Sequence, residues 1–153
     1  VVYIGDGQNS AGPVGDDLNK TLDKLIDGRV SVSSYAVGPD SNNAFLASVS
    51  NLTGGALVID GKAITAQQAA QIMQNLVSET VLWPTDVKLP KNISKLYPGK
   101  LPPLRADRDT VVIGEGKLDQ PFDVSVTADS SGKPVELKWS VAPNKSNDDN
   151  AYL

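Results

Sequence analysis

The sequence predicts an α/β fold: half of a doubly wound parallel sheet, with three strands and three helices, followed by antiparallel β-strands of a sandwich. Over residues 1–80, short apolar runs alternate three times with amphipathic helical segments, which is typical of a parallel sheet. Beyond residue 110, apolar and polar residues alternate instead, as in antiparallel strands with one buried face. The 153 residues are enough for one domain and part of a second.

The opening stretch is the apolar run Val1-Val2-Tyr3-Ile4, followed by Gly5-Asp6-Gly7. A short apolar run that ends at turn residues predicts a strand buried on both faces. The two glycines allow a sharp turn after it. Asp6 then lies at the carboxyl end of the strand, where open α/β sheets bind ligands. Two interpretations stay open, because Asp6 could equally shape the turn or cap the next element.

The rest of the first half alternates helices and strands. The expected helices span 16–27, about 42–52 and 66–80, and the expected strands span 30–37 and 56–59. Asp16 or Asp17 can cap the first helix, Thr65 can cap the third, and Gly28 can end the first. The apolar positions expected to be buried on the second and third helices are Ala44, Phe45, Val49, Leu52, Ala69, Ile72, Met73, Leu76 and Val77.

The second half is divided by prolines. Five prolines between residues 83 and 104 exclude a helix and indicate extended edge segments or a linker. Strands are expected over 110–114, 122–127 and 135–141, with 129–134 as a hairpin loop. We therefore expect three parts, 1–82, a Pro-rich extended connection over 83–109, and an antiparallel β segment over 110–153. The mixed charges at 105–109 favour structural ion pairs over catalysis.

Composition excludes several kinds of function. A net charge of −4 without a basic patch argues against a nucleic-acid partner, and no apolar run is long enough to span a membrane. The chain has neither Cys nor His, which excludes thiolate chemistry, a Ser-His-Asp triad and sites built on those ligands. A metal site would need oxygen ligands, and so would favour Mg, Ca or Mn. We expect a protein that is not an enzyme.

The order of motifs over the first 80 residues resembles the C-terminal half of a von Willebrand factor A domain. The strand that ends in Ile4-Gly5-Asp6-Gly7 is followed by helix 16–27, a Val-x-Val-x-x-Tyr-x-Val-Gly strand ending at Gly38, a helix with Leu46 and the turn Thr53-Gly54-Gly55. The resemblance implies that Asp6 belongs to a metal-ion-dependent adhesion site. The same resemblance implies that the loop lining this site is Gly5, Gly7, Gln8, Asn9 and Ser10. The Asp-x-Ser-x-Ser motif and the separate Thr of that family belong to the first half of such a domain.

A second part of the chain extends this resemblance. Residues 96–104, followed by 107–114, resemble the segment after the A domain in inter-alpha-trypsin-inhibitor-heavy-chain-like proteins. There the chain leaves the A domain and adds strands to a β-sandwich. The resemblance implies a longer parent protein, with Mg bound only in that parent and no cofactor in the chain by itself. It also favours a secreted or extracytoplasmic location, with a protein ligand as partner.

One short motif supports an alternative. Gly5-Asp6-Gly7-Gln8-Asn9-Ser10 is similar to the Gly-Asp-Gly-x-Asn-Asp motif of haloacid-dehalogenase-type phosphatases, with Ser10 in place of the second Asp. That resemblance implies Asp6 and Asn9 as ligands beside a metal, but it covers six residues. The A-domain resemblance covers about 80 residues in order, so an adhesion-type protein-interaction fragment is the preferred hypothesis. A third possibility is a scaffold without a working metal site.

The opening strand also predicts self-association. In the A-type arrangement, Val1, Val2, Tyr3 and Ile4 pair on one side with 30–37, and the other side has no partner within this chain. Such an apolar edge carries no Pro or Lys that would prevent pairing with another strand. We therefore expect a homodimer in which two copies of this edge pair antiparallel across a two-fold axis.

Overall fold

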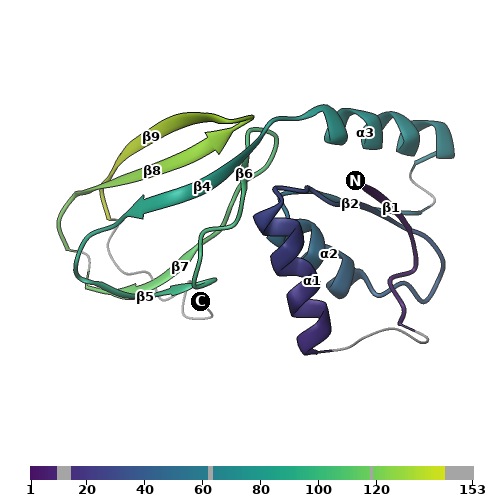
Figure 1. Cartoon of the computed structure of the whole chain (residues 1–153), viewed down its shortest axis with the longest axis horizontal. Helices are drawn as coiled ribbons and strands as arrows, with labels where there is room; N and C mark the ends of the chain where they lie inside the picture. The colour runs from purple at the N-terminus through teal and green to yellow at the C-terminus, as the bar shows by residue number, and fades with distance from the viewer. Residues whose placement is uncertain (10–14, 62–63, 118, 144–153) are drawn as a thin grey trace. The chain divides into compact units, whose positions relative to one another are not determined.

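The computed structural model describes residues 1–9, 15–61, 64–117 and 119–143. The chain forms two compact units, one made of Val1–Val81 with Pro103–Arg108, and one made of Leu82–Pro102 with the chain from Asp109 onward (Figure 1). The first unit is a parallel sheet with helices, and the second is made of antiparallel strands. The fold class predicted from the sequence, α/β with following antiparallel strands, is therefore confirmed.

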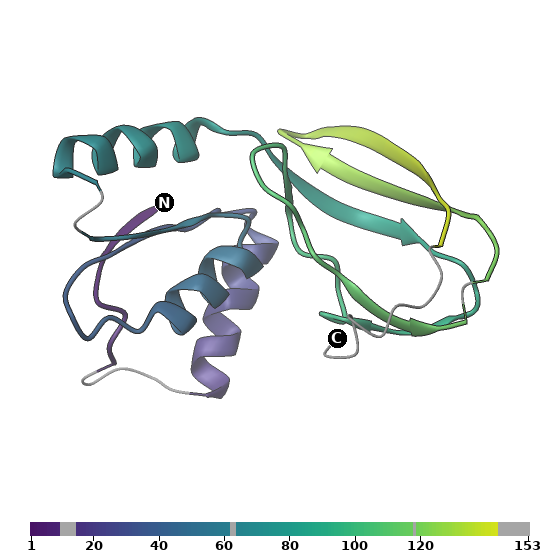
Figure 2. The same cartoon turned by 180° about the vertical axis from the view of Figure 1, so that it is seen from behind.

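The first unit is a parallel sheet between helices. Its strands β1 (Val2–Gly5), β2 (Ser33–Ala36) and β3 (Leu57–Ile59) lie in the order β1-β2-β3. The helices α1 (Asp16–Asp27) and α2 (Asn43–Leu52) lie on one face of the sheet, and α3 (Ala66–Ser78) lies on the other (Figures 1 and 2). A middle strand covered on both faces should carry small or apolar side chains, and Ser33, Ser34 and Ala36 of β2 are all buried.

Buried hydroxyl groups connect β2 to α2. The Ser50 hydroxyl donates to the Ser34 hydroxyl at 3.2 Å. The Thr53 hydroxyl accepts from the Val32 amide at 3.1 Å and donates to the Val49 carbonyl at 2.8 Å. Each of these buried hydroxyls therefore has a hydrogen-bond partner, which removes the cost of taking it out of water.

The helix ends differ in part from expectation. Gly15 is the N-cap of α1 and there is no side-chain cap, so the expectation that Asp16 or Asp17 caps this helix is wrong. The helix begins at Asp16, as expected, and both carboxylates lie in its first turn, where they interact favourably with the helix dipole. Gly28 ends α1 as predicted. Thr65 caps α3 in a capping box with Gln68, also as predicted.

The buried faces of the later helices are also corrected. Leu46 and Ser50 are the buried residues of α2, whereas Ala44 is exposed. Asn42 caps this helix by accepting from the Phe45 amide at 3.1 Å, which fixes where α2 begins. On α3, the buried residues are Ala69 and Met73. Two residues expected on its buried face are instead exposed, Ile72 and Val77.

The strand β1 is an edge strand. Its register from Val2 opposite Ser33 to Gly5 opposite Ala36 confirms the predicted pairing with 30–37. The expectation that this strand is buried on both faces is wrong, because Val1 and Ile4 each keep 66% of their surface exposed. Within the described residues, β2 is its one neighbour in the sheet. An apolar β-branched run fits a strand, but burial also needs elements that cover it.

The segment Pro103–Arg108 belongs to the first unit and contains the short strand β6 (Leu104–Arg105). The guanidinium of Arg105, whose side chain is 1% exposed, donates to the Gly54 carbonyl at 3.1 Å and to the Leu76 carbonyl at 3.0 Å. It also binds both carboxylate oxygens of Asp107, at 2.7 and 2.6 Å. This hydrogen-bonded partner holds the pKa of Asp107 below its ordinary value. The predicted structural ion pair is confirmed.

Close packing, as well as these hydrogen bonds, fixes the conformation of the Gly54-Gly55 turn, which was predicted to end α2. Gly54 has φ +72°, and a Cβ there would lie 2.7 Å from side-chain atoms of Pro103 and Val81. A Cβ on Gly55 would lie 1.9 Å from the Val32 carbonyl oxygen. Arg108 donates to the Gly55 carbonyl at 2.5 Å. The turn between α2 and β3 therefore requires glycine at both positions.

The second unit contains two antiparallel groups of strands. Strands β4 (Val81–Lys88), β8 (Phe122–Ser130) and β9 (Lys133–Val141) are neighbours in that order, and β5 (Ile93–Tyr97) pairs with β7 (Ile113–Gly116). Trp83, Val126 and Ala128 are its buried apolar residues. The predicted hairpin is confirmed, but its loop is shorter than the expected 129–134. The loop is Ser131-Gly132, with φ 52° and 83°, the signature of a tight type I′ turn.

Replacing Arg105 tests how much the first unit depends on its buried guanidinium. We expect Arg105→Ala to lower the free energy of unfolding by about 3 kcal/mol, because two backbone carbonyls and Asp107 lose a charged partner. Urea denaturation measures this. Lys20→Ala is the control, since it removes an exposed ion pair at 3.3 Å and should cost less than about 0.5 kcal/mol. Equal losses in the two variants would contradict the role assigned to Arg105.

Candidate functional site

Acidic residues follow the parallel strands at one edge of the sheet. Asp6 comes directly after β1 and Asp60 directly after β3, and the loop after β2 contains Asp40. Because β1, β2 and β3 are parallel, their carboxyl ends share one edge. Open α/β sheets bind ligands at this edge. The predicted site residue Asp6 is therefore at the position where a ligand would be expected, and it is exposed to solvent.

Asp6 forms a turn with its own loop. Its Oδ1 accepts from the Gln8 amide at 2.9 Å, which is the pattern of an Asx turn. Its backbone carbonyl accepts from the Asn42 amide at 2.6 Å, and the Gln8 side chain donates to the Asp40 carbonyl at 2.5 Å. These bonds join the loop after β1 to the residues before α2. Asp6 thus shapes the turn, as the simpler interpretation of the sequence predicted, while remaining accessible.

The two glycines around Asp6 lie close to neighbouring side chains, and Gly7 also has a backbone conformation that favours glycine. Gly7 has φ +68°, and a Cβ there would lie 2.8 Å from Cγ of Leu46. The Tyr3 hydroxyl accepts from the Gly7 amide at 3.3 Å, and a Cβ on Gly5 would lie 2.6 Å from that hydroxyl oxygen. Tyr3 therefore folds back over the turn. Gly7 therefore has a steric explanation that is independent of any ligand.

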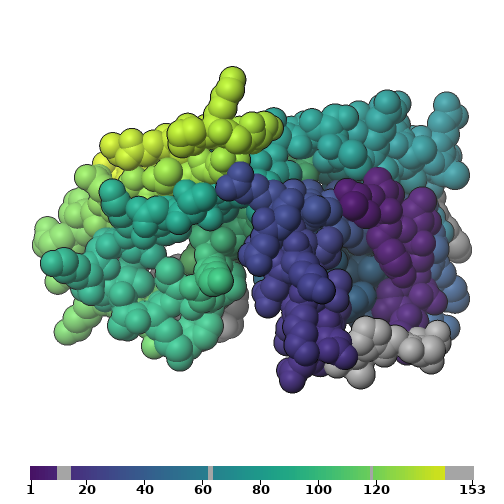
Figure 3. Space-filling model, viewed as in Figure 1, coloured from purple at the N-terminus to yellow at the C-terminus, as the bar shows by residue number. Residues whose placement is uncertain are grey.

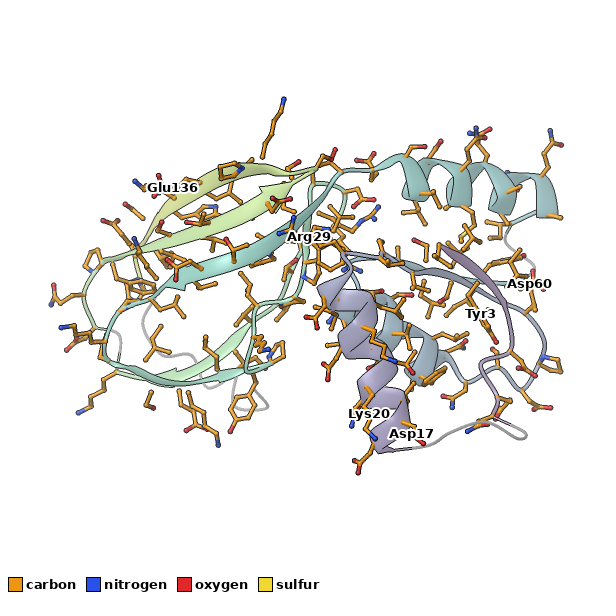
Figure 4. The ribbon with its side chains drawn as sticks, viewed as in Figure 1. Tyr3, Asp17, Lys20, Arg29, Asp60 and Glu136 are labelled. Atoms are coloured by element: carbon orange, nitrogen blue, oxygen red, sulfur yellow. The ribbon has the colours of Figure 1, made fainter. Side chains whose placement is uncertain are left out.

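A polar pair that sequence reasoning did not identify lies at the same edge. The Tyr35 hydroxyl donates to Oδ1 of Asp60 at 2.8 Å (Figure 4 labels Asp60). This hydrogen bond to a carboxylate raises the pKa of the Tyr35 phenol, because it stabilises the protonated form. The strand register brings the two side chains together. Tyr35 is opposite Val58 in the parallel pair, and Asp60 follows two residues after Val58, just beyond the end of β3.

The described residues do not make a complete metal site. Among them, no group of three or more acidic side chains lies close enough to hold a metal ion. A divalent ion such as Mg needs about six oxygen ligands, and Asp6 supplies one carboxylate. Of the loop predicted to line the site, Gly5, Gly7, Gln8 and Asn9 lie within the described residues and Ser10 lies outside them. The structure leaves the metal role of Asp6 untested.

Comparisons with known proteins were made by family model, by curated sequence and by structure. No family model matches the chain, and no curated protein matches it. Its structure is similar to the crystal structure of the ArnB paralog VWA2 from Sulfolobus acidocaldarius, with 13% sequence identity and a TM-score of 0.42. The match covers 99% of this chain and 42% of that one, so the chain spans less than half of the length of its structural neighbour. At this score the likeness carries no argument about function.

Within the part of the chain that the structure describes, no helix is long and apolar enough to cross a membrane. The resemblance to inter-alpha-trypsin-inhibitor-heavy-chain-like proteins gains no support from the comparisons, and it stays a prediction.

Asp6→Ala tests whether the carboxylate is needed for folding. We expect the free energy of unfolding to change by less than about 1 kcal/mol, because Asp6 is exposed and its backbone bond to Asn42 is retained. Gly7→Ala is the contrasting variant and should cost about 2 kcal/mol or more, because its Cβ would collide with Leu46. Urea denaturation compares the two. A large loss in Asp6→Ala would mean that the carboxylate caps buried backbone groups.

Proposed function

We propose that the chain is a fragment of an adhesion-type protein-interaction module, in which Asp6 contributes one oxygen ligand to a metal site that residues of a longer parent protein complete. The observation that carries this proposal is the position of Asp6, exposed at the carboxyl end of a parallel strand. The order of motifs over the first 80 residues supports the same assignment. The proposed protein is a binding protein and has no catalytic residues.

The residues of this chain would orient the Asp6 carboxylate. The Gln8 amide holds Oδ1, and the bond from Asn42 to the Asp6 carbonyl fixes the backbone beneath it. Oriented ligands bind a metal more tightly than mobile ones, because less freedom is lost on binding. When bound, Mg would offer an open coordination position to a carboxylate of a protein partner.

Calorimetry with Mg tests the proposal on two proteins, the chain by itself and a longer natural chain. The chain by itself should show no Mg or Ca site tighter than about 100 μM, because an assembled oxygen cage is needed for that affinity. A longer natural chain that includes the residues before Val1 should bind Mg, and Asp6→Ala should weaken that binding about tenfold or more. Asp17→Ala, which removes an exposed carboxylate on α1, is the matched control.

The residues that precede Val1 in the source protein separate the proposal from its alternative. An Asp-x-Ser-x-Ser motif there would support an adhesion site. An Asp-x-Asp-x-Thr motif would instead indicate phosphoryl transfer, with Asp6 and Asn9 beside the metal. Absence of both motifs, together with no Mg binding by the longer chain, would overturn the metal-dependent function and leave a scaffold.

The edge of β1 supports a second part of the proposal, self-association. The Val1 carbonyl accepts from the Ser33 amide, and the Gly5 carbonyl accepts from the Val37 amide. In a strand, the backbone N–H and C=O groups of successive residues point to opposite sides. Val2 and Ile4 therefore direct their N–H and C=O groups away from β2. We propose that two copies pair antiparallel along this edge, formed by Val1, Val2, Tyr3 and Ile4.

Val2→Pro tests this pairing. The variant removes an outward N–H donor and should convert a dimer to a monomer without breaking the bonds between β1 and β2. Val2→Ala keeps the donor and is the control. Sedimentation at about 100 μM, above the micromolar range of a specific interface, measures the outcome. A wild-type chain that is monomeric there would exclude the β1 dimer.

A further inference from the structure

Strand β9 is a second open edge, in the other unit. It spans nine residues and ends the row β4-β8-β9 within the described residues. In a hairpin closed by a two-residue turn, the two residues that flank the turn form a hydrogen-bonded pair, and here these residues are Ser130 and Lys133. Along the hairpin from there, non-hydrogen-bonded and hydrogen-bonded pairs alternate. Glu136 is opposite Thr127 in a non-hydrogen-bonded pair. The Thr127 carbonyl accepts from the Thr85 hydroxyl of β4 at 3.1 Å, which agrees with this assignment.

The register fixes which backbone groups of β9 are open. Glu136, Lys138 and Ser140 direct their N–H and C=O groups away from β8, because they belong to the non-hydrogen-bonded pairs. The backbone of Pro134 also faces away from β8, so the hairpin loses no hydrogen bond through the missing N–H of this proline. Proline therefore restricts pairing at the turn end of the edge. From 136 to 140 the edge contains no proline.

The two faces of β9 have opposite character. Glu136 and Lys138 share one face, where their side chains form an ion pair at 3.0 Å, and both are exposed (Figure 4 labels Glu136). The nearby Lys138 lowers the pKa of the Glu136 carboxyl, which favours the charged form of Glu136. The other face carries Val135, Leu137 and Trp139, of which Trp139 is 47% exposed. Figure 3 shows β9, in yellow-green, at the surface of the second unit.

We propose that two copies of this chain join through β9, antiparallel across a two-fold axis that passes through Leu137. In this register Glu136 lies opposite Lys138 of the second copy, and the symmetry makes the same pair twice. On the apolar face, Leu137 lies opposite its own copy and Val135 lies opposite Trp139 of the second copy. The strands β4, β8 and β9 of both copies then form one continuous sheet.

Charge complementarity selects a second copy of β9 as the partner strand, and it also selects the register of the pairing. A two-fold axis through Glu136 would set two carboxylates directly opposite each other, and one through Lys138 would set two ammonium groups opposite each other. Like charges directly opposite on neighbouring strands are destabilising, whereas opposite charges stabilise the pair. A two-fold axis through Leu137 gives the register between these two, and in it each charged residue lies opposite a residue of the other sign. A second copy of β9 therefore matches this edge in charge and apolar contacts, and in hydrogen bonding at Glu136 and Lys138. Ser140 lies opposite Pro134 of the second copy, which can accept from the Ser140 amide but has no N–H to donate.

Charge exchange tests the proposal by sedimentation across protein concentration. Glu136→Lys alone, or Lys138→Glu alone, sets like charges opposite in both symmetric pairs and should weaken dimerisation about tenfold or more. The double variant Glu136→Lys with Lys138→Glu restores opposite charges and should recover the wild-type affinity. Lys91→Glu, at an exposed position of the same unit, is the control for net charge and should leave dimerisation unchanged.

Trp139 supplies an independent signal. On pairing it should lose exposure to water, so its fluorescence should shift to shorter wavelength as the protein concentration rises, whereas Trp83 is already buried. Trp139→Phe should abolish the shift. A wild-type chain that stays monomeric at about 100 μM overturns the proposal. So does a dimer that is insensitive to both single charge reversals, and a dimer abolished by Val2→Pro alone would assign the contact to β1 instead.

Discussion

The first unit depends on the buried guanidinium of Arg105. A buried charge is tolerated only when it is paired and hydrogen-bonded, and Arg105 meets this condition with two backbone carbonyls and both oxygens of Asp107. The carbonyl of Leu76 lies in the last turn of α3, where the helix leaves it without an internal partner. The carbonyl of Gly54 lies in the turn that leads to β3. One side chain thus satisfies acceptors from two separate elements.

The neighbouring Arg108 bonds the same turn, but its guanidinium is less fully paired. Arg108 donates to the Gly55 carbonyl, but its Nε and Nη2 are buried and have no hydrogen-bond partner within the described residues. Burial lowers the pKa of this guanidinium, with a further contribution from the charge of Arg105. The difference between the two arginines lies in Asp107, which forms both of its bonds with Arg105. Both arginines therefore bond the Gly54-Gly55 turn, and Arg105 also has Asp107 as a hydrogen-bonded partner.

The sequence predicted the elements better than their burial. Periodicity and caps located α1, α3 and the β8–β9 hairpin, because these signals lie within a few residues of each other. Burial of β1 was mispredicted, since its cover must come from elements distant in the sequence. Ala44 was mispredicted because the buried side of α2 carries Leu46 and Ser50, and a buried serine gives no apolar signal in the sequence. The Asx turn of Asp6 followed from Gly5-Asp6-Gly7, whereas the Tyr35–Asp60 bond depended on a register between two strands.

The two open edges have different capacities for pairing. The edge of β1 presents outward backbone groups at Val2 and Ile4 and offers no charges to set a register. The edge of β9 presents them over 136–140 and adds two charged residues of opposite sign. A longer edge gains more hydrogen bonds for a similar loss of translational freedom, so pairing through β9 should be the stronger of the two.

Symmetry then decides what happens if both edges pair. Each contact is isologous and closes on itself, so a single active edge yields a dimer. Two active edges on the same chain would link dimers to further dimers and produce an open-ended assembly. A finite protein therefore needs one edge to be covered. Pairing through β1 is proposed for this chain by itself. In a longer parent whose residues cover β1, β9 would be the edge through which copies associate.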